Sequence, residues 1–496
     1  MGELLKVNNL TKTFPGVKAL DNLSFSLKQG EVHALCGENG AGKSTLIKCI
    51  SGIWKYGSYE GEITLGESLC KFTGIQDSEK AGIAVIYQEL ALVEDMTVAE
   101  NIFLGREPRK GLLVDWHKMY KNAHDLLHEF GLNLNPASKV GSLGVGQQQL
   151  VEIVKALAKN ARVLLLDEPT AALTDKEVEI LLNIVEKLRV KGICCVYISH
   201  RLEEVLKIAD TITVIRDGQS IASKPRIDWT YNSIVSAMVG REITDLYPRA
   251  SHSKGEMKLD VKDFKSGILK DISFKVYGGE VLGLGGLMGA GRSELLMDIF
   301  AGIGSREEGD ITLNGKPYIS STALESISRG LIMVTEDRKK LGLILDESIA
   351  FNLSLSNLSS FQKNGLINGH AEMAENKKYA SSLRVKAPDL SVTVGGLSGG
   401  NQQKVVLGRA LMTEPEIIFL DEPTRGIDVG AKVEVYELIN KLTSQGKAVV
   451  LVSSEMPELI GMSDRILILS NGRIAGEFSG DDVNQKQLLE AAMKYS

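Results

Sequence analysis

The stretch EVHALCGENGAGKSTLIKCI, residues 31–50, decides the fold of the first half of this 496-residue chain. Glu31 to Cys36 is largely apolar and predicts a buried strand, and a helix is expected to run to Ile50 after a glycine-rich loop. This is a phosphate-loop pattern in the strand–loop–helix setting that it requires, and its glycines let backbone N–H groups approach phosphate oxygens at a helix N-terminus. The loop residues are Gly37, Glu38, Asn39, Gly40, Ala41, Gly42, Lys43, Ser44 and Thr45.

A second motif, VLLLDE at residues 163–168, supplies the acidic groups that such a loop needs. We expect Lys43 to bridge the β- and γ-phosphates, and Ser44 and Asp167 to hold Mg²⁺. Glu168 is then the natural general base for an attacking water. An acid at the end of an apolar strand is a weak signal alone, but beside a phosphate loop it predicts hydrolysis of ATP with Mg²⁺.

The same features recur about 250 residues later. Ser24–Glu31 matches Ser273–Glu280 at a shift of 273 − 24 = 249, and the DEPT sequence at Asp167 recurs at Asp421 at a shift of 421 − 167 = 254. Several ordered matches at nearly one shift indicate a duplicated domain. We therefore expect a first domain at 1–242, a linker at 243–256 and a second domain at 257–496.

Apolar runs alternate with helical patterns in each half. Residues 163–166 and 193–198 are continuously apolar, as in strands buried on both faces. Each half also ends with a two-residue turn signal between apolar strands, Asp217-Gly218 and Asn471-Gly472. The fold class predicted by this alternation is α/β, with a mostly parallel sheet in each half.

Composition excludes several classes of protein. Apolar residues make up 43% and charged residues 24%, which is a globular balance. The net charge of −6, with acids and bases mixed, makes nucleic-acid binding a poor expectation. No apolar run is long enough to span a bilayer, and the N-terminus lacks a signal-peptide core. The five cysteines have no zinc or redox spacing, so we expect them to be buried and reduced.

The stretch LSGGNQQ, residues 397–403, completes a set of motifs through which the chain resembles the ABC ATPase family over nearly its whole length. The resemblance implies two tandem nucleotide-binding domains, each with an antiparallel β part and a helical signature subdomain beside the parallel core. It also implies that the signature of one domain caps the γ-phosphate of ATP bound to the other. Ser398, Gly399 and Gly400 would do so here, and a serine hydroxyl at a glycine-rich helix N-terminus is a sound phosphate donor.

The resemblance assigns four further residues to the first site. Gln88 matches the Q-loop glutamine, which senses Mg²⁺ and the membrane partner, and His200 matches the switch histidine that contacts the γ-phosphate. Phe14 stands where the family places an aromatic ring that stacks on adenine, and Asp428 matches the D-loop aspartate. Taken singly, His200 and Phe14 would be ordinary buried residues, but their order and spacing favour the functional interpretation.

The second half departs from the family, and the departures gather in one of the two expected sites. Arg292 replaces the loop lysine, and arginine is bulkier and forked, so the two are not equivalent in a tight loop. Glu336 and Ser454 replace the Q-loop glutamine and the switch histidine, and Gly144 of the first half lacks the signature serine hydroxyl. Thr174 replaces the D-loop aspartate, while Glu422 is retained. The second, degenerate site comprises Gly286, Gly289, Gly291, Arg292, Ser293, Glu336, Asp421, Glu422, Ser454, Gly144 and Gly146.

His124 and His128, four residues apart on an expected helix, could form a metal pair. A solvated helical face explains them without further ligands, and we favour that interpretation.

The sequence DEPTRGIDVGAK, residues 421–432, with LSGGNQQK and the tandem arrangement, resembles the ATP-binding subunits of bacterial monosaccharide importers. Within that group CGENG (36–40), GSYEGEI (57–63) and the serine-less LGVGQ (143–147) are most similar to D-xylose importers, with arabinose, ribose or galactose as alternatives. The resemblance implies a peripheral protein on the cytoplasmic face of the inner membrane. Its partners would be integral-membrane permease subunits and, through them, a periplasmic or extracellular sugar-binding protein, with no direct contact to sugar.

Two other classes of tandem ABC protein fit less well. A translation factor would carry a long basic arm between its domains and two intact sites. A DNA-repair protein would carry cysteine-rich zinc modules, which five scattered cysteines cannot supply.

Overall fold

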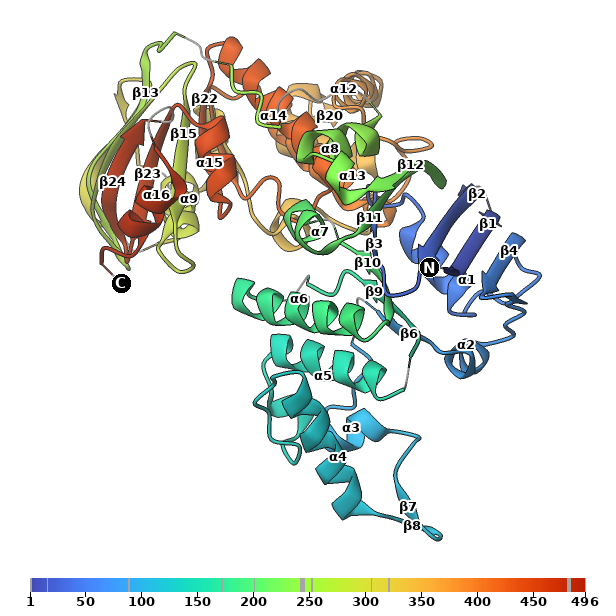
Figure 1. The fold of residues 1–496 in the computed structure, drawn as a ribbon. Coiled ribbons are helices and arrows are strands. Elements are labelled where there is room, and N and C mark those ends of the chain that lie inside the picture. The colour runs from blue at the N-terminus through green and yellow to red at the C-terminus, as the bar shows by residue number, and fades with distance from the viewer. Residues whose placement is uncertain are drawn as a thin grey trace. The chain divides into compact units, whose positions relative to one another are not determined.

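The computed structural model describes residues 2–15, 17–87, 90–159, 161–170, 173–199, 201–240, 246–250, 253–304, 306–319, 322–479 and 483–495. The chain divides into two compact units, Met1–Thr244 and Asp245–Ser496, and each is described by itself (Figure 1). Each unit contains a six-stranded sheet, a four-stranded antiparallel sheet and a group of helices.

The core of the first unit is a sheet of order β12-β11-β3-β10-β9-β6. All neighbours in it are parallel except β11 and β12, which form an antiparallel hairpin at one edge. Every residue of β3, β9 and β10 is buried, as expected of strands covered on both faces. The strands are β3 Val32–Cys36, β6 Ile83–Ile86, β9 Val163–Asp167, β10 Cys194–Ile198, β11 Thr211–Arg216 and β12 Gln219–Pro225.

An antiparallel sheet of order β2-β1-β4-β5 shares one apolar core with this parallel sheet. Its alternate residues point inward, and Leu5, Leu23 and Ile63 pack in one cluster with Leu165 of the parallel sheet. The strands are β1 Glu3–Phe14, β2 Val17–Lys28, β4 Glu60–Leu65 and β5 Ser68–Leu69, and a separate two-stranded hairpin pairs β7 Arg109–Lys110 with β8 Leu113–Val114.

Three helices, α3, α4 and α5, lie in the chain between β6 and β9 and form the helical part of the first unit (Figure 1). The helix α3 begins with a capping box in which Thr97 and Glu100 satisfy each other's backbone N–H groups. The helices of the unit are α1 Lys43–Ile50, α2 Ile75–Ala81, α3 Val98–Phe103, α4 Trp116–Glu129, α5 Val145–Leu157, α6 Asp175–Val190, α7 Leu202–Ile208 and α8 Tyr231–Val239.

The second unit repeats the architecture, with a core sheet of order β18-β21-β22-β15-β23-β24 and an antiparallel sheet of order β14-β13-β16-β17. The strands are β13 Met257–Ser266, β14 Leu269–Tyr277, β15 Val281–Gly286, β16 Arg306–Leu313, β17 Lys316–Pro317, β18 Leu331–Val334, β19 Gln362–Lys363, β20 Leu366–Ile367, β21 Ile417–Asp421, β22 Ala448–Val452, β23 Arg465–Ser470 and β24 Arg473–Ser479. The helices are α9 Arg292–Ala301, α10 Ala323–Ser328, α11 Ile349–Ser354, α12 Gly369–Ser382, α13 Gly399–Leu411, α14 Val429–Ser444, α15 Met456–Met462 and α16 Gln485–Ala492. The α/β fold class, with its parallel cores, antiparallel sheets and helical parts, is confirmed.

Both two-residue turns are present where the sequence predicts them. Asp217 and Gly218 join β11 to β12 with φ of 49° and 78°, and Asn471 and Gly472 join β23 to β24 with φ of 45° and 75°. Positive φ at both central residues matches the twist of a tight hairpin, and Asn, Asp and Gly tolerate it best.

Residues 246–250, which fall within the expected linker, pack on the second unit. The Tyr247 ring lies 5.5 Å from that of Tyr436, and Arg249 donates to the carbonyl of Ser463 at 2.9 Å. This part of the linker is therefore held by α14 and by the residue that follows α15.

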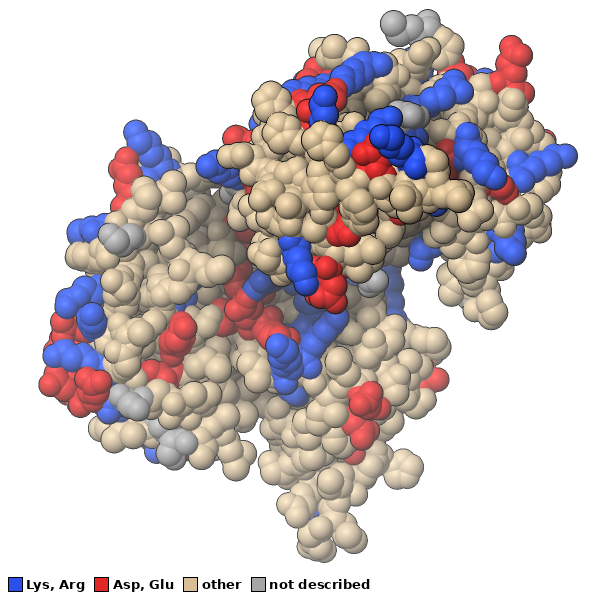
Figure 2. Space-filling model, turned by 90° about the horizontal axis from the view of Figure 1, so that it is seen from below, with Lys and Arg blue, Asp and Glu red and all other residues tan. Residues whose placement is uncertain are grey.

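The distribution of charge on the surface and the burial of the cysteines agree with what the sequence predicts. Acidic and basic side chains lie interspersed on the face shown in Figure 2. All five cysteines are free and buried, and burial raises the pKa of Cys36 and Cys49 to about 12. Among the described helices, none is long and apolar enough to cross a bilayer.

Candidate nucleotide sites

The loop of the first half connects the carboxyl end of β3 to the N-terminus of α1. A Cβ on Gly37 would lie 2.4 Å from the carbonyl oxygen of Ile215, and one on Gly42 would lie 2.4 Å from that of Ala19. Gly42 also has φ of 101° and precedes α1 without a side-chain cap, so the first N–H groups of the helix receive no side-chain acceptor from the N-cap residue. The backbone is shaped as an anion cradle that only glycine permits at these two positions.

Lys43, the first residue of α1, lies over this loop. Its Nζ donates to the carbonyls of Gly37 at 2.6 Å and Glu38 at 2.9 Å, and its side chain is almost fully buried. A buried ammonium held by two carbonyls of the loop is placed beside any phosphate that the loop binds.

Ser44 and Asp167 meet below the loop. The Asp167 carboxyl ends β9, and the Ser44 hydroxyl lies beside it, where it lowers the carboxyl pKa against the larger, opposite effect of burial. The Asp167 side chain is buried, and this burial raises the pKa of its carboxyl. Hard oxygen ligands of this kind suit Mg²⁺.

Glu168 follows directly and has a left-handed backbone, with φ of 51°, while its N–H donates to the carbonyl of Ile198 at 3.0 Å. Glu422 of the second half repeats both features, with φ of 48° and a bond to Val452 at 3.0 Å. Strained backbone of this kind persists only where surrounding contacts fix it, and here β9 and β21 each end one residue before the acid.

A buried carboxylate that the sequence analysis missed anchors the loop after Glu168. Glu204 on α7 accepts hydrogen bonds from Thr170 at 2.9 Å, Tyr197 at 2.9 Å and Ser199 at 3.2 Å. Glu458 accepts from Thr424 at 2.8 Å in the second half, again at a shift of 254, so the internal repeat could have identified both residues.

Removal of this anchor is expected to destabilise the first unit. Glu204→Ala would leave three buried hydroxyl donors without their acceptor, which costs about 2–4 kcal/mol in the free energy of unfolding. Urea unfolding measures that change, and Glu203→Ala, a substitution of the exposed neighbouring acid, is the matched control. Equal stability of the two variants would show that Glu204 does not anchor the loop.

The second-half loop has the same backbone but a different cation. A Cβ on Gly286 would lie 2.4 Å from the carbonyl of Leu469, and Gly289 and Gly291 have φ of 77° and 99°. Arg292 contacts two residues outside the loop: its Nη1 donates to the carbonyl of Ser453 at 2.9 Å and lies 3.5 Å from the Glu422 carboxylate. The loop cation of this half therefore neutralises the residue that would act as its base.

Two neighbours further confine the second-half acids. The Ser454 hydroxyl donates to Glu422 at 3.1 Å, and burial raises the pKa of Glu422. The Ser293 hydroxyl lies beside Asp421 and lowers the pKa of its carboxyl, whose Oδ1 is buried and has no hydrogen-bond partner among the described residues. An unpartnered carboxylate oxygen beside a serine hydroxyl fits a divalent cation.

The residues that begin α5 (144–147) and α13 (398–401) are called the signature turns of the first and second half. The two turns differ in the hydrogen-bond donors that they offer to a phosphate. In the second half Asn401 donates to the Ser398 hydroxyl oxygen at 3.0 Å, so the Ser398 proton remains available to another acceptor. In the first half Gly144 has no hydroxyl, and its own N–H is satisfied by Gln147 at 3.4 Å. Asp428 caps α14 by accepting from Ala431 at 2.8 Å.

Gln88 and His200 lie outside the described residues, so their expected positions are not placed. Glu336, at the position equivalent to Gln88, forms an ion pair with Arg425. The Thr174 hydroxyl, at the D-loop position of the first half, donates to the Glu177 carboxylate.

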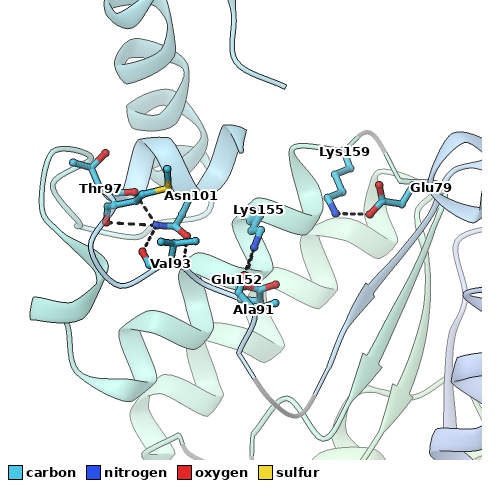
Figure 3. Close-up of polar contacts among 9 residues, drawn as sticks. Glu79, Ala91, Val93, Thr97, Asn101, Glu152, Lys155 and Lys159 are labelled. Carbon is cyan, nitrogen blue, oxygen red and sulfur yellow. Dashed lines mark hydrogen bonds and ion pairs between the residues drawn. The ribbon is translucent and has the colours of Figure 1, made fainter. Parts of the chain in front are cut away.

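The segment that follows Gln88 is held by a buried asparagine that the sequence analysis also missed. Asn101 accepts from the N–H of Val93 at 2.8 Å and donates to the carbonyls of Val93 and Thr97 at 3.0 and 3.1 Å (Figure 3). Lys155 of α5 reaches the Ala91 carbonyl at 2.5 Å in the same view. Asn352 binds Ile344 and Ser348 in the same way in the second half, so both units stiffen this segment.

Phe14 closes the end of the β1–β2 hairpin, with its ring edge-on to Trp54 at 5.2 Å and Lys12 Nζ 5.2 Å above it. The matching hairpin of the second half is shorter. Leu10 pairs with Leu23 but Phe264 pairs with Ile272, a difference of 13 − 8 = 5 residues. The extension that carries Phe14 is therefore missing from the second half.

His124 and His128 stack at 6.3 Å on an exposed face of α4. Among the described residues no group of three His, Cys, Asp or Glu side chains could hold a metal ion.

Known proteins are similar to this chain over nearly its whole length. Residues 20–171 and 269–425 match the family described as ABC transporter. The chain is 52% identical to the xylose import ATP-binding protein XylG of Moorella thermoacetica, over 99% of this chain and 98% of that protein. It is 45% identical to the L-arabinose transport ATP-binding protein AraG of Geobacillus stearothermophilus, over 99% and 98%. It is 43% identical to the galactose/methyl galactoside import ATP-binding protein MglA of Clostridium perfringens, over 99% and 96%.

Proposed function

This chain belongs to the ABC transporter family and is an ATPase of that family. We propose that it powers the import of a monosaccharide and that this sugar is D-xylose. The observation that carries the proposal is the similarity, over nearly the full length, to a xylose import ATP-binding protein at 52% identity. Arabinose, ribose and galactose are the alternatives, since relatives named for arabinose and galactose match at 45% and 43%.

The first half holds the working site in this proposal. The loop N–H groups and Lys43 bind the phosphates of ATP, and Ser44 and Asp167, with Gln88, hold Mg²⁺, which neutralises charge on the β- and γ-phosphates when bound. Glu168 accepts the proton of the attacking water, and His200 contacts the γ-phosphate. Phe14 stacks on adenine. The contacts of Lys43 with the loop and of Ser44 with Asp167 support these assignments.

The second-half loop binds nucleotide but contributes little hydrolysis. Its base, Glu422, is held by Arg292 and Ser454, and its cation donates to the carbonyl of Ser453, outside the loop. In the arrangement that the sequence predicts, Ser398, Gly399, Gly400 and Asp428 act on the nucleotide at the Lys43 loop.

Permease subunits dock on the helical parts in this proposal, which places the protein on the cytoplasmic face of the membrane. Large apolar side chains are exposed in this region in both units, most of all Leu112 at 96%, Leu113 at 76% and Leu366 at 76% on the small hairpins. The stiffened segments at Asn101 and Asn352 lie beside these helices. Sugar contacts belong to the permease and a sugar-binding protein.

The sugar is tested by ATPase measurements on the full chain reconstituted with its permease and sugar-binding protein, across D-xylose, arabinose, ribose and galactose. We expect D-xylose to stimulate hydrolysis most, because the similarity at 52% identity to a xylose import ATP-binding protein favours this sugar. Stimulation by ribose or galactose with no response to xylose would contradict the assignment, and omission of the permease is the control for coupling.

A further inference from the structure

The charge beside the two signature turns differs in sign. In the first half a carboxylate lies against the turn: a Cβ on Gly146 would lie 2.2 Å from Oε1 of Glu177 and 2.3 Å from Oε2. Gly146 is in the first turn of α5, the part of a helix that attracts anions. Glu177 therefore already places a negative charge where a phosphate would have to approach.

The Glu177 carboxylate is fixed in this position. It belongs to the first turn of α6, where its Oε2 accepts from the N–H of Thr174 at 2.9 Å and from the Thr174 hydroxyl at 2.7 Å. Among the described residues, no lysine or arginine forms an ion pair with it. Its charge is therefore not offset by a neighbouring cation.

The second half has a cation at the matching turn. A Cβ on Gly399 would lie 2.7 Å from Nη2 of Arg338, whose guanidinium donates to the carbonyls of Arg425 at 2.9 Å and Gly426 at 3.3 Å. No carboxylate of the described residues pairs with Arg338, and its Nε is buried without a hydrogen-bond partner there. Burial lowers the pKa of Arg338, but a guanidinium remains charged.

The internal repeat shows that both groups are specific to one half. At a shift of 254 the counterpart of Glu177 is Ala431, whose Cβ lies 3.0 Å from a Cβ built on Gly400. The shift is 248 between β6 and β18 and 251 between Val93 and Ile344, and residues 83–104 of the first half contain no lysine or arginine, so Arg338 has no cationic counterpart there. One carboxylate does approach the second turn, since Asp428 Oδ2 would lie 3.7 Å from a Cβ on Gly400, and Thr174 replaces Asp428 in the first half. The guanidinium of Arg338 lies closer to the turn, 2.7 Å from a Cβ on Gly399.

We propose that Glu177 and Arg338 determine which signature turn accepts a γ-phosphate: Glu177 repels it from the first-half turn, and Arg338 attracts it to the second-half turn. The inference rests on the proposed function, in which the Ser398 turn serves the Lys43 loop. It adds a cause of the asymmetry that is independent of Arg292 and of the missing signature serine. It also predicts that the first-half turn disfavours a nucleoside triphosphate relative to a diphosphate.

The test transfers the carboxylate to the second half of the full chain. Ala431→Glu places a glutamate at the position that Glu177 holds, and Ala431→Gln adds the same bulk without charge. Both residues suit this position of a helix, where Glu177 completes a capping box. We expect Ala431→Glu to lower ATPase kcat/KM about 10²-fold relative to Ala431→Gln, since a fixed negative charge held close to a phosphate repels it even at the effective dielectric constant of a protein surface. Equal activities of the two variants would overturn the proposal.

A second measurement covers the case in which Ala431→Glu fails to fold. In a Lys43→Ala background, Glu177→Gln keeps the capping hydrogen bonds and removes the charge, so binding of a fluorescent ATP analogue should strengthen severalfold relative to the ADP analogue. An unchanged ratio would contradict a charge effect. Lys43→Ala also separates the two proposals, because full hydrolysis in that variant would refute the proposed site itself, whereas its inactivity with equal Ala431 variants would refute only the role of charge.

Discussion

Lys43→Ala is expected to abolish nearly all ATP hydrolysis. The Lys43 ammonium is buried and lies on the loop carbonyls of Gly37 and Glu38, and in the proposed function it faces the negative charge that develops during phosphoryl transfer. Single electrostatic donors of this kind contribute about 3–4 kcal/mol of transition-state stabilisation, which corresponds to about 10²–10³-fold in kcat. Steady-state ATPase of the reconstituted transporter measures the loss.

Two further variants of the chain provide a control and a comparison for the loss in Lys43→Ala. Lys48→Ala removes an exposed lysine of the same helix and should leave most of the activity. Arg292→Ala should cost less than Lys43→Ala, because the Arg292 guanidinium is committed to Ser453 and Glu422. A loss from Arg292→Ala as large as that from Lys43→Ala would show that both loops carry out hydrolysis.

Glu168→Gln is expected to stop turnover while ATP still binds. Glutamine keeps the length and hydrogen-bonding reach of glutamate but cannot accept the proton of the attacking water, a role worth about 10²–10⁴-fold in rate. The backbone that presents Glu168, fixed by its bond to the Ile198 carbonyl, does not depend on the side-chain charge. Retention of a fluorescent ATP analogue and the rate of phosphate release are the two measurements.

Loss of ATP binding in Glu168→Gln would contradict the role of Glu168 as the general base. If Glu168→Gln no longer binds the analogue, the side chain shapes the nucleotide site rather than activating water. Asp167, which lies beside Ser44, would then be the next candidate for the general base.

The phosphate loops and their acids could be predicted from the sequence because each depends on a local pattern. Glycine spacing at 37–42 forces the loop, and an apolar strand that ends in Asp167 places the acid beside it. The duplication was equally visible, since repeats need no tertiary information. It also contained an unused signal, because Glu204 and Glu458 recur at the same shift as the acids that they anchor.

Side-chain direction could not be predicted in this way. That arginine differs from lysine was evident, but the turn of Arg292 toward Glu422 depends on strands β21 and β22 lying side by side. The contact of Glu177 with Gly146 likewise joins the first turns of two helices that are far apart in the sequence. Such contacts follow from packing between elements, which periodicity does not report.

The central claim, that one of two duplicated sites performs the hydrolysis, is tested most directly by steady-state ATPase of Glu168→Gln beside Glu422→Gln, each with permease and sugar-loaded binding protein. The account predicts that Glu168→Gln loses about 10²-fold or more and that Glu422→Gln keeps substantial turnover, because Glu422 is already held by Arg292 and Ser454. Equal losses would mean two working sites, and a greater loss from Glu422→Gln would reverse the assignment.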